Sequence, residues 1–267
     1  MIITFSGTGN SLMVARLLGA ELADNNIVEL EGASLQDNRL DETDSDSERR
    51  IIWVFPTYSW GIPPVVKSYI ESLTFNAPGD SFHHLVVTCG DDVGNLGKQW
   101  QRLLKRKRWK AGGMWSVQMP NTYVLMKGFD VDPDKVEKEK LSLCRERVAH
   151  VARRIETKQN DDDLVKGKFA AFKTSVIYPW FVKFNMSPRP FFANDHCTGC
   201  SLCAKECPTM NITMTADSST LKPLWGAKCA LCLRCYHHCP VNAVQYGKAT
   251  RGKGQYQIDK VLAEMER

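Results

Sequence analysis

The chain begins MIITFSGTGNSL (residues 1–12), and this stretch carries the signals of a strand, a loop and a helix in that order. Residues 2–5 form an apolar run, and apolar residues recur at helical spacing from Leu12 to Leu22. The glycines between them let the backbone approach an anion, hydroxyls at 6, 8 and 11 can donate hydrogen bonds, and a helix N-terminus attracts negative charge. The opening predicts a phosphate site, although a Gly-rich turn before a helix can also serve only close packing.

Strands and helices continue to alternate through the first 160 residues. Helical spacing predicts helices at 65–73, 95–106 and 133–156. Four further apolar runs predict strands, at 27–30, 51–55, 85–89 and 115–119. Five alternating strands indicate the α/β class with a doubly wound five-stranded parallel sheet, whose ligand site lies at the carboxyl ends of the strands. That edge holds residues 6–11, 56–61, 90–94 and 120–123.

These residues resemble a short-chain flavodoxin. The resemblance implies that flavin mononucleotide (FMN) binds with its phosphate on Ser6, Gly7, Thr8, Gly9, Asn10 and Ser11. It also implies that Thr57, Tyr58, Ser59, Trp60 and Gly61 border the isoalloxazine ring, and that Cys89, Gly90 and Asp91 bond its pyrimidine edge. Trp60 or Tyr58 is expected to stack on the ring, although Trp60 could instead be an ordinary rim or core aromatic. Gly61 is the candidate for a peptide flip, since glycine tolerates both orientations.

One feature departs from many flavodoxins. The loop at 90–95 has no aromatic residue, so one flavin face is expected to be open, or to be covered by Tyr123 or by the C-terminal part of the chain. Cys89 could be a redox thiol, but a small apolar residue that ends a strand is the favoured interpretation.

Eight of the ten cysteines lie between residues 197 and 239, in two copies of C-x2-C-x2-C-x3-C-P. This run is typical of bacterial two-cluster ferredoxins and implies two 4Fe-4S clusters. In that pattern the fourth ligand comes from the opposite run. One cluster is therefore expected on Cys197, Cys200, Cys203 and Cys239, and the other on Cys229, Cys232, Cys235 and Cys207. A zinc ribbon or a disulfide framework fits eight cysteines in this arrangement less well.

The predicted organisation has four parts. A flavodoxin-like FMN-binding domain at 1–160 is followed by a connecting segment at 161–192, a smaller α+β ferredoxin-type domain at 193–250, and a C-terminal tail or helix at 251–267. The connecting segment interleaves aromatic residues with lysines. Such a stretch can lie on a membrane surface, or pack between two domains with lysine stems over the seam. Packing is favoured because exposed aromatics would be sticky in water, so peripheral membrane contact is not expected.

The composition and charge of the chain indicate which functional classes it does not fit. A net charge of +5 is mild and spread over both halves, which does not indicate nucleic-acid binding. No apolar run approaches the length of a transmembrane helix, and a cytoplasmic location is expected. The basic run at 105–110 is either a solvated helix end or a docking patch for an acidic redox partner.

Over nearly its full length the chain is similar to flavodoxin-ferredoxin fusion proteins of anaerobic bacteria and archaea. The resemblance implies electron transfer among two 4Fe-4S clusters, FMN, and low-potential donor and acceptor proteins. An electron carrier is favoured because no acid, base or nucleophile constellation stands out, and no catalytic residue is assigned. The alternatives are a ferredoxin-linked flavin reductase of a small oxidised molecule, with Asp91, Asn121 or Tyr123 as proton donor, and a cluster-based sensor or binding module.

Overall fold

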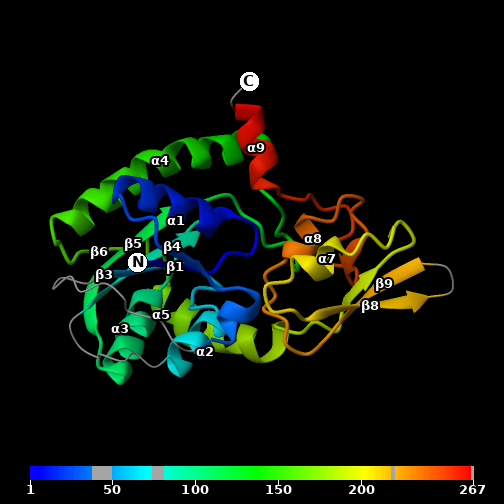
Figure 1. Ribbon diagram of the computed structural model, residues 1–267, viewed down its shortest axis with the longest axis horizontal. Helices are drawn as coiled ribbons and strands as arrows, with labels where there is room; N and C mark the ends of the chain where they lie inside the picture. The colour runs from blue at the N-terminus through cyan, green and yellow to red at the C-terminus, as the bar shows by residue number, and fades with distance from the viewer. Residues whose placement is uncertain (38–49, 74–80, 218–219, 266–267) are drawn as a thin grey trace.

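The computed structural model describes residues 1–37, 50–73, 81–217 and 220–265 (Figure 1). Its larger part is a sheet whose strands pair in the order β2-β1-β3-β4-β5-β6, with every pair parallel. The strands are β1 (Ile2–Thr4), β2 (Ile27–Glu29), β3 (Arg50–Pro56), β4 (Phe82–Cys89), β5 (Lys110–Gln118) and β6 (Asp162–Asp163). The predicted parallel α/β fold is confirmed, with β6 as a sixth strand that the apolar pattern did not predict.

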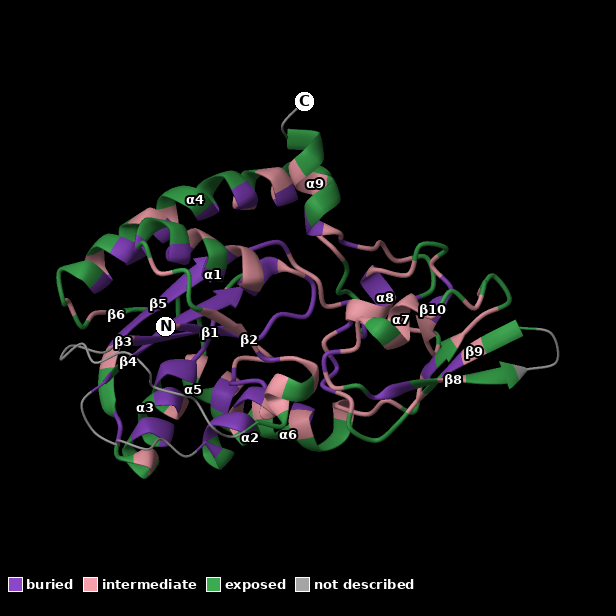
Figure 2. Cartoon of the chain, viewed as in Figure 1, coloured by how far each residue is buried: buried purple, intermediate pink, exposed green. Residues whose placement is uncertain are grey.

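Helices cover both faces of this sheet, as Figure 1 shows. On one face, α1 (Asn10–Glu21) and α4 (Asp134–Glu156) bury an apolar stripe that includes Val14, Leu18 and Val148. On the other, α2 (Pro64–Ser72) and α3 (Leu96–Lys107) bury Val66, Ile70 and Trp100. The central strands lie between these two apolar layers and are buried along most of their length (Figure 2). The sheet edge that carries the predicted site is therefore rigidly supported.

The strand β5 begins at Lys110, five residues before the predicted start. Its early part contains Gly112 and Gly113, which weaken a strand signal in the sequence. The β4–β5 register shifts between His83 and Leu85, and the Gly113 N–H donates to the His84 ring (3.1 Å). A Cβ on Gly112 would lie 2.5 Å from that ring, so the bulge depends on glycine.

The C-terminal part is smaller and of α+β type, as predicted. The strand β7 (Phe191–Ala193) pairs antiparallel with β10 (Val244–Tyr246), and β8 (Ile212–Asp217) pairs antiparallel with β9 (Thr220–Trp225). Two short helices, α7 (Leu202–Lys205) and α8 (Arg234–His237), each contain the third cysteine of a run, Cys203 and Cys235 respectively. The chain then returns to the larger part, where α9 (Ile258–Met265) contacts α4 and Ile258 joins its core.

The connecting segment contains a continuous helix, the connecting helix, made of α5 (Ala170–Phe172), η2 (Lys173–Ile177), α6 (Tyr178–Trp180) and η3 (Phe181–Asn185). The stretches η2 and η3 are π-helical. Phe181 and Phe191 are buried, as the packing prediction requires, but Phe169, Phe172, Trp180, Phe184 and Phe192 are exposed. The prediction was wrong for these five. Only one face of the helix reaches the protein, and Phe192 lies on β7, where it alternates with the buried Phe191. Among the described helices, none has the length and apolar character to cross a membrane.

Candidate functional site

The predicted phosphate loop lies where β1 gives way to α1. Gly9 precedes the helix with a φ of 95°, a left-handed conformation that glycine adopts without strain. The Gly9 N–H donates to Ser6 Oγ (3.1 Å), which closes the loop. The N-terminus of a twelve-residue helix is thus presented next to the loop, where its free N–H groups and dipole favour an anion.

Asn10 and Ser11 are tied to neighbouring loops. Asn10 Nδ2 donates to Pro120 O (3.0 Å), and the Tyr256 hydroxyl donates to Asn10 Oδ1 (2.7 Å). Ser11 Oγ and Thr88 Oγ1 share a hydrogen bond of 2.7 Å. The Asn10 side chain therefore positions the phosphate loop, and sequence reasoning alone did not distinguish this role from direct phosphate contact.

A cavity of about 360 Å³ lies at this edge of the sheet, a size typical of small-molecule sites. The phosphate loop and the loops after β3, β4 and β5 line it. Twelve of the residues predicted for FMN are in the lining, and Gly9 and Gly61 are not; the twelve are Ser6, Gly7, Thr8, Asn10, Ser11, Thr57, Tyr58, Ser59, Trp60, Cys89, Gly90 and Asp91.

Two features of the lining fit a bound flavin. Thr57 Oγ1 is buried and has no hydrogen-bond partner among the described residues. Such a hydroxyl costs roughly 1–3 kcal/mol unless a ligand satisfies it. At Gly90, a Cβ would lie 1.6 Å from Asn121 Oδ1, so the pyrimidine-edge loop depends on the absence of a side chain. Together with the phosphate loop and the aromatic residues Tyr58 and Trp60, these features suit a planar cofactor that carries a phosphate.

The loop from Tyr58 to Gly61 is a tight turn. Tyr58 and Gly61 exchange both backbone hydrogen bonds (3.0 and 2.9 Å), and Ser59 and Trp60 have φ values of 45° and 64°. A Cβ on Gly61 would meet the Tyr178 ring at 2.3 Å. Gly61 is therefore required for packing and its carbonyl is already paired, which argues against the predicted flip at Gly61. The left-handed Ser59–Trp60 peptide is the strained one.

The connecting helix holds Trp60 from outside. Thr174 Oγ1 donates to Trp60 O (2.8 Å), and Lys173 Nζ lies 4.8 Å from the centre of the Trp60 ring. Lys173 also forms an ion pair with Asp92 (2.6 Å), and both side chains are mostly shielded from solvent. Ile177, Trp180 and Phe181 of this helix line the cavity, as do Tyr123, Met126 and Phe129. The missing aromatic of the 90–95 loop is thus replaced by residues from the connecting helix and from the loop after β5.

The cysteines gather into two groups, each of which crosses the two runs. The pKa of the Cys203 thiol is raised to about 11, first by burial and then by the charges of Cys197, Cys200 and Cys239. Burial likewise raises the pKa of Cys235, and its charged neighbours are Cys232, Cys229 and Cys207. Cys239 is thus near the first run and Cys207 near the second, and the crossed ligand sets stay a prediction. Among the described residues, no three His, Cys, Asp or Glu side chains converge on a position for a single metal ion.

Backbone amides point at the sulfurs in a way that repeats between the two runs. Asn211 N donates to Cys207 Sγ (3.3 Å), and Ala243 N donates to Cys239 Sγ (3.2 Å). In each run the donor follows the fourth cysteine by four residues. Hydrogen bonds of this kind stabilise thiolates and influence cluster potential.

The two parts of the chain meet at the cavity. Leu231, Cys232 and Leu233 line it together with the phosphate loop. A Cβ on Gly7 would lie 2.4 Å from Cys232 O, so the backbone of the phosphate loop packs directly on a cysteine loop. Burial raises the pKa of Tyr58, and the charges of Cys232 and Cys229 add to that effect. One cysteine group is thus adjacent to the cavity that fits a flavin.

Arg234 fixes this contact. Its guanidinium donates to Ser6 O (2.7 Å), Gly7 O (3.0 Å) and Glu206 O (3.1 Å), and pairs with Glu31 (2.7 Å). The side chain is only 15% exposed. The planar guanidinium has several N–H groups and can bond all these oxygens at once. A lysine ammonium could not reproduce this arrangement.

A buried histidine makes a second contact between the two parts of the chain. His237 Nε2 donates to Thr122 O (2.8 Å), and the Tyr256 N–H donates to His237 Nδ1 (3.0 Å), a pattern that requires the neutral ring. Burial lowers the pKa of His237 to about 4, consistent with that form. Sequence reasoning missed the contributions of Arg234, His237, Tyr256, Thr88, Leu231 and Leu233, because no local motif indicates a contact over so long a separation. Cys232 was predicted as a cluster ligand but not as part of this cavity.

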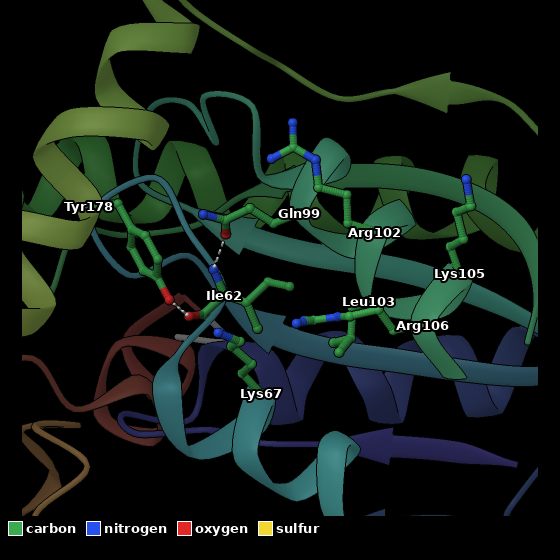
Figure 3. Close-up of a pocket in the computed structure, with 8 residues that line it drawn as sticks. All are labelled: Ile62, Lys67, Gln99, Arg102, Leu103, Lys105, Arg106 and Tyr178. Carbon is green, nitrogen blue, oxygen red and sulfur yellow. Dashed lines mark hydrogen bonds between the residues drawn. The ribbon is translucent and has the colours of Figure 1, made fainter. Parts of the chain in front are cut away.

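A second hollow of about 600 Å³ lies between α2, α3 and the connecting helix (Figure 3). Its apolar floor is Ile62 and Leu103, and cationic side chains surround it: Lys67, Arg102, Lys105 and Arg106. Figure 3 shows Tyr178 and Gln99 bonded to the backbone of Ile62. Although larger, this hollow contains neither the phosphate loop nor a cysteine, so it does not match the flavin site predicted from the sequence.

Fold and site together define a flavodoxin-like α/β part joined to an iron-sulfur part. Residues 196–244 match the family model of the 4Fe-4S dicluster domain. No curated protein matches the chain.

Solved structures resemble the N-terminal part at low similarity. A putative flavoprotein from Bacteroides uniformis is 18% identical over 44% of this chain and 90% of its own, with a TM-score of 0.33. An azoreductase from Bacillus anthracis is 16% identical over 57% of this chain and 98% of its own, with a TM-score of 0.37. A short-chain flavodoxin associated with a bacterial microcompartment is 14% identical over 59% of this chain and 97% of its own, with a TM-score of 0.33.

Proposed function

We propose that this chain is an electron-transfer protein that relays electrons between two 4Fe-4S clusters, one FMN and external redox partners. The observation that carries the proposal is the shared cavity, in which Cys232 and its neighbours line the wall next to the phosphate loop. Iron-sulfur clusters exchange single electrons and flavin exchanges one or two, so their combination interconverts the two stoichiometries.

The protein's own residues supply binding and orientation. The phosphate loop and the N-terminus of α1 hold the phosphate, and the hydroxyl of Thr57 offers a hydrogen bond to the flavin ring. Tyr58 and Trp60 cover the ring and exclude water. The crossed cysteine sets hold the clusters, with Cys207 and Cys239 each completing the site of the opposite run.

The proposed partners are low-potential donor and acceptor proteins, and the proposed location is the cytoplasm. The cationic rim around Lys105 and Arg106 would suit an acidic partner.

The test uses anaerobically purified protein with iron, sulfide and FMN bound. Dithionite should bleach the clusters, and the reduced clusters should then reduce FMN. If dithionite does not reduce the clusters, or if reduced clusters leave FMN oxidised, the proposal fails, and the clusters are better interpreted as structural or sensory.

A second candidate, an FMN-dependent reductase of a small oxidised molecule, is favoured by Asp91, a carboxylate in the cavity wall. Tyr123 suits proton donation less well, because burial raises its pKa to about 12. An Asp91→Asn variant separates the two functions. A reductase should lose turnover of the small acceptor while FMN reduction by the clusters continues, whereas a carrier should show no such difference.

A further inference from the structure

The connecting helix presents an apolar stripe to the outside of the molecule. Phe169, Phe172, Val176, Trp180 and Phe184 form the stripe, and each is between 51% and 79% exposed. The inner face is made of Thr174, Tyr178 and Phe181, which contact the flavodoxin-like part. A surface helix is usually apolar inside and polar outside, whereas this helix is apolar on its outer face as well.

Helix geometry keeps the stripe straight. From Phe172 onward its members are four residues apart, and in a regular α-helix that spacing rotates each side chain by roughly 40° from the last. The π-helical stretches η2 and η3 contain wider turns, which rotate less per residue and reduce this drift. Pro179, which lacks an N–H, removes one regular helical bond in the same region.

Charge indicates what covers the stripe. Residues 164–192 contain five basic residues and no Asp or Glu. Two of the five form ion pairs with acidic residues outside this range, Lys166 with Asp162 and Lys173 with Asp92. Lys168 is exposed directly before Phe169, and Lys183 Nζ lies over the Phe184 ring at 5.1 Å. Two copies of this chain would bring like charges together on such a face. A surface of lipid with anionic headgroups instead matches both the aromatic stripe and its cationic flanks.

We propose that the stripe Phe169, Phe172, Val176, Trp180 and Phe184 docks this protein on an anionic membrane surface, with the connecting helix lying in the lipid–water interface. The aromatic side chains enter the headgroup region, and Lys168 and Lys183 contact lipid phosphates. This reverses the sequence-based preference against peripheral membrane contact. Because Trp180 also lines the flavin cavity, docking places that side of the cavity next to the membrane.

The test is co-sedimentation of the anaerobic holoprotein with vesicles. Binding is expected to vesicles of phosphatidylcholine and phosphatidylglycerol in equal parts, to be weak with phosphatidylcholine alone, and to fall as salt is raised. A double variant, Phe172→Ser with Phe184→Ser, should lower vesicle affinity about tenfold or more. Neither residue lines the cavity, so cluster and flavin spectra should be unchanged.

The matched control is Leu143→Ser with Leu224→Ser, two comparably exposed apolar residues on α4 and β9. It should bind vesicles like the unmodified protein. Lys168→Glu with Lys183→Glu should weaken binding to the anionic vesicles only. The proposal is overturned if the unmodified protein does not bind anionic vesicles, or if the Phe variant binds them equally well. It is also overturned if light scattering shows that the unmodified protein is a dimer and the Phe variant a monomer.

Discussion

Replacement of Arg234 by Ala should loosen the contact between the phosphate loop and the adjacent cysteine loop. The guanidinium makes four hydrogen bonds of 2.7–3.1 Å, two of them to the backbone of the phosphate loop. Hydrogen bonds to charged groups contribute roughly 1.5–3 kcal/mol each, but the freed carbonyls can in part bond water. We therefore expect the variant to lose on the order of 3 kcal/mol of unfolding free energy.

The matched control is Arg147→Ala. Arg147 also anchors its surroundings, with three hydrogen bonds to Ser116 O and to two oxygens of Asp163. It lies on α4, bonds to β5 and β6, and does not line the cavity. FMN affinity, measured by anaerobic fluorescence titration, should fall about tenfold or more in Arg234→Ala, and electron transfer from clusters to FMN should slow. Arg147→Ala should change neither. If both variants retain FMN affinity and transfer rate, Arg234 does not organise the site.

Three further changes test separate parts of the account. Gly7→Ala should weaken FMN binding and slow cluster-to-flavin transfer, because its Cβ would meet Cys232 O at 2.4 Å; normal stopped-flow rates would contradict the close packing. Cys207→Ser should remove the cluster held by the second cysteine run, together with the electron-paramagnetic resonance signal of that cluster. If only the signal of the other cluster is lost, the predicted pairing is wrong. Burial, then the charges of nearby carboxylates, raises the pKa of Glu137 from 4.5 to about 7. Between these two pH values the Glu137 carboxyl is protonated in the folded protein and ionised in the unfolded protein. The free energy of unfolding should therefore fall as pH rises from about 4.5 to about 7. Glu137→Gln should flatten that slope in thermal melts.

Local patterns in the sequence predicted the features that depend on neighbouring residues. Apolar periodicity located the central strands and the helix α4, and the spacing of the cysteines predicted sets that the structure brings together. The strand β6 escaped prediction because Asp162–Asp163 has no apolar signal and pairs over only two residues. The early part of β5 was hidden by its glycines.

Contacts between distant parts of the chain could not be predicted in this way. Arg234 and Gly7 are 227 positions apart, and nothing local distinguishes Arg234 from an ordinary surface arginine. The connecting helix shows the same limit. Its composition indicated an amphipathic segment, but which face packs depends on Thr174 and Tyr178 finding Trp60 O and Ile62 O.

The most direct test of the central claim is the concentration dependence of FMN reduction after the clusters are rapidly reduced under anaerobic conditions. The sample should contain about eight iron atoms, about eight sulfides and about one FMN per chain. Because Gly7 packs against Cys232 within one molecule, the rate constant should be the same at every protein concentration. A rate that rises in proportion to protein concentration would show that electrons pass between molecules, and would contradict the account.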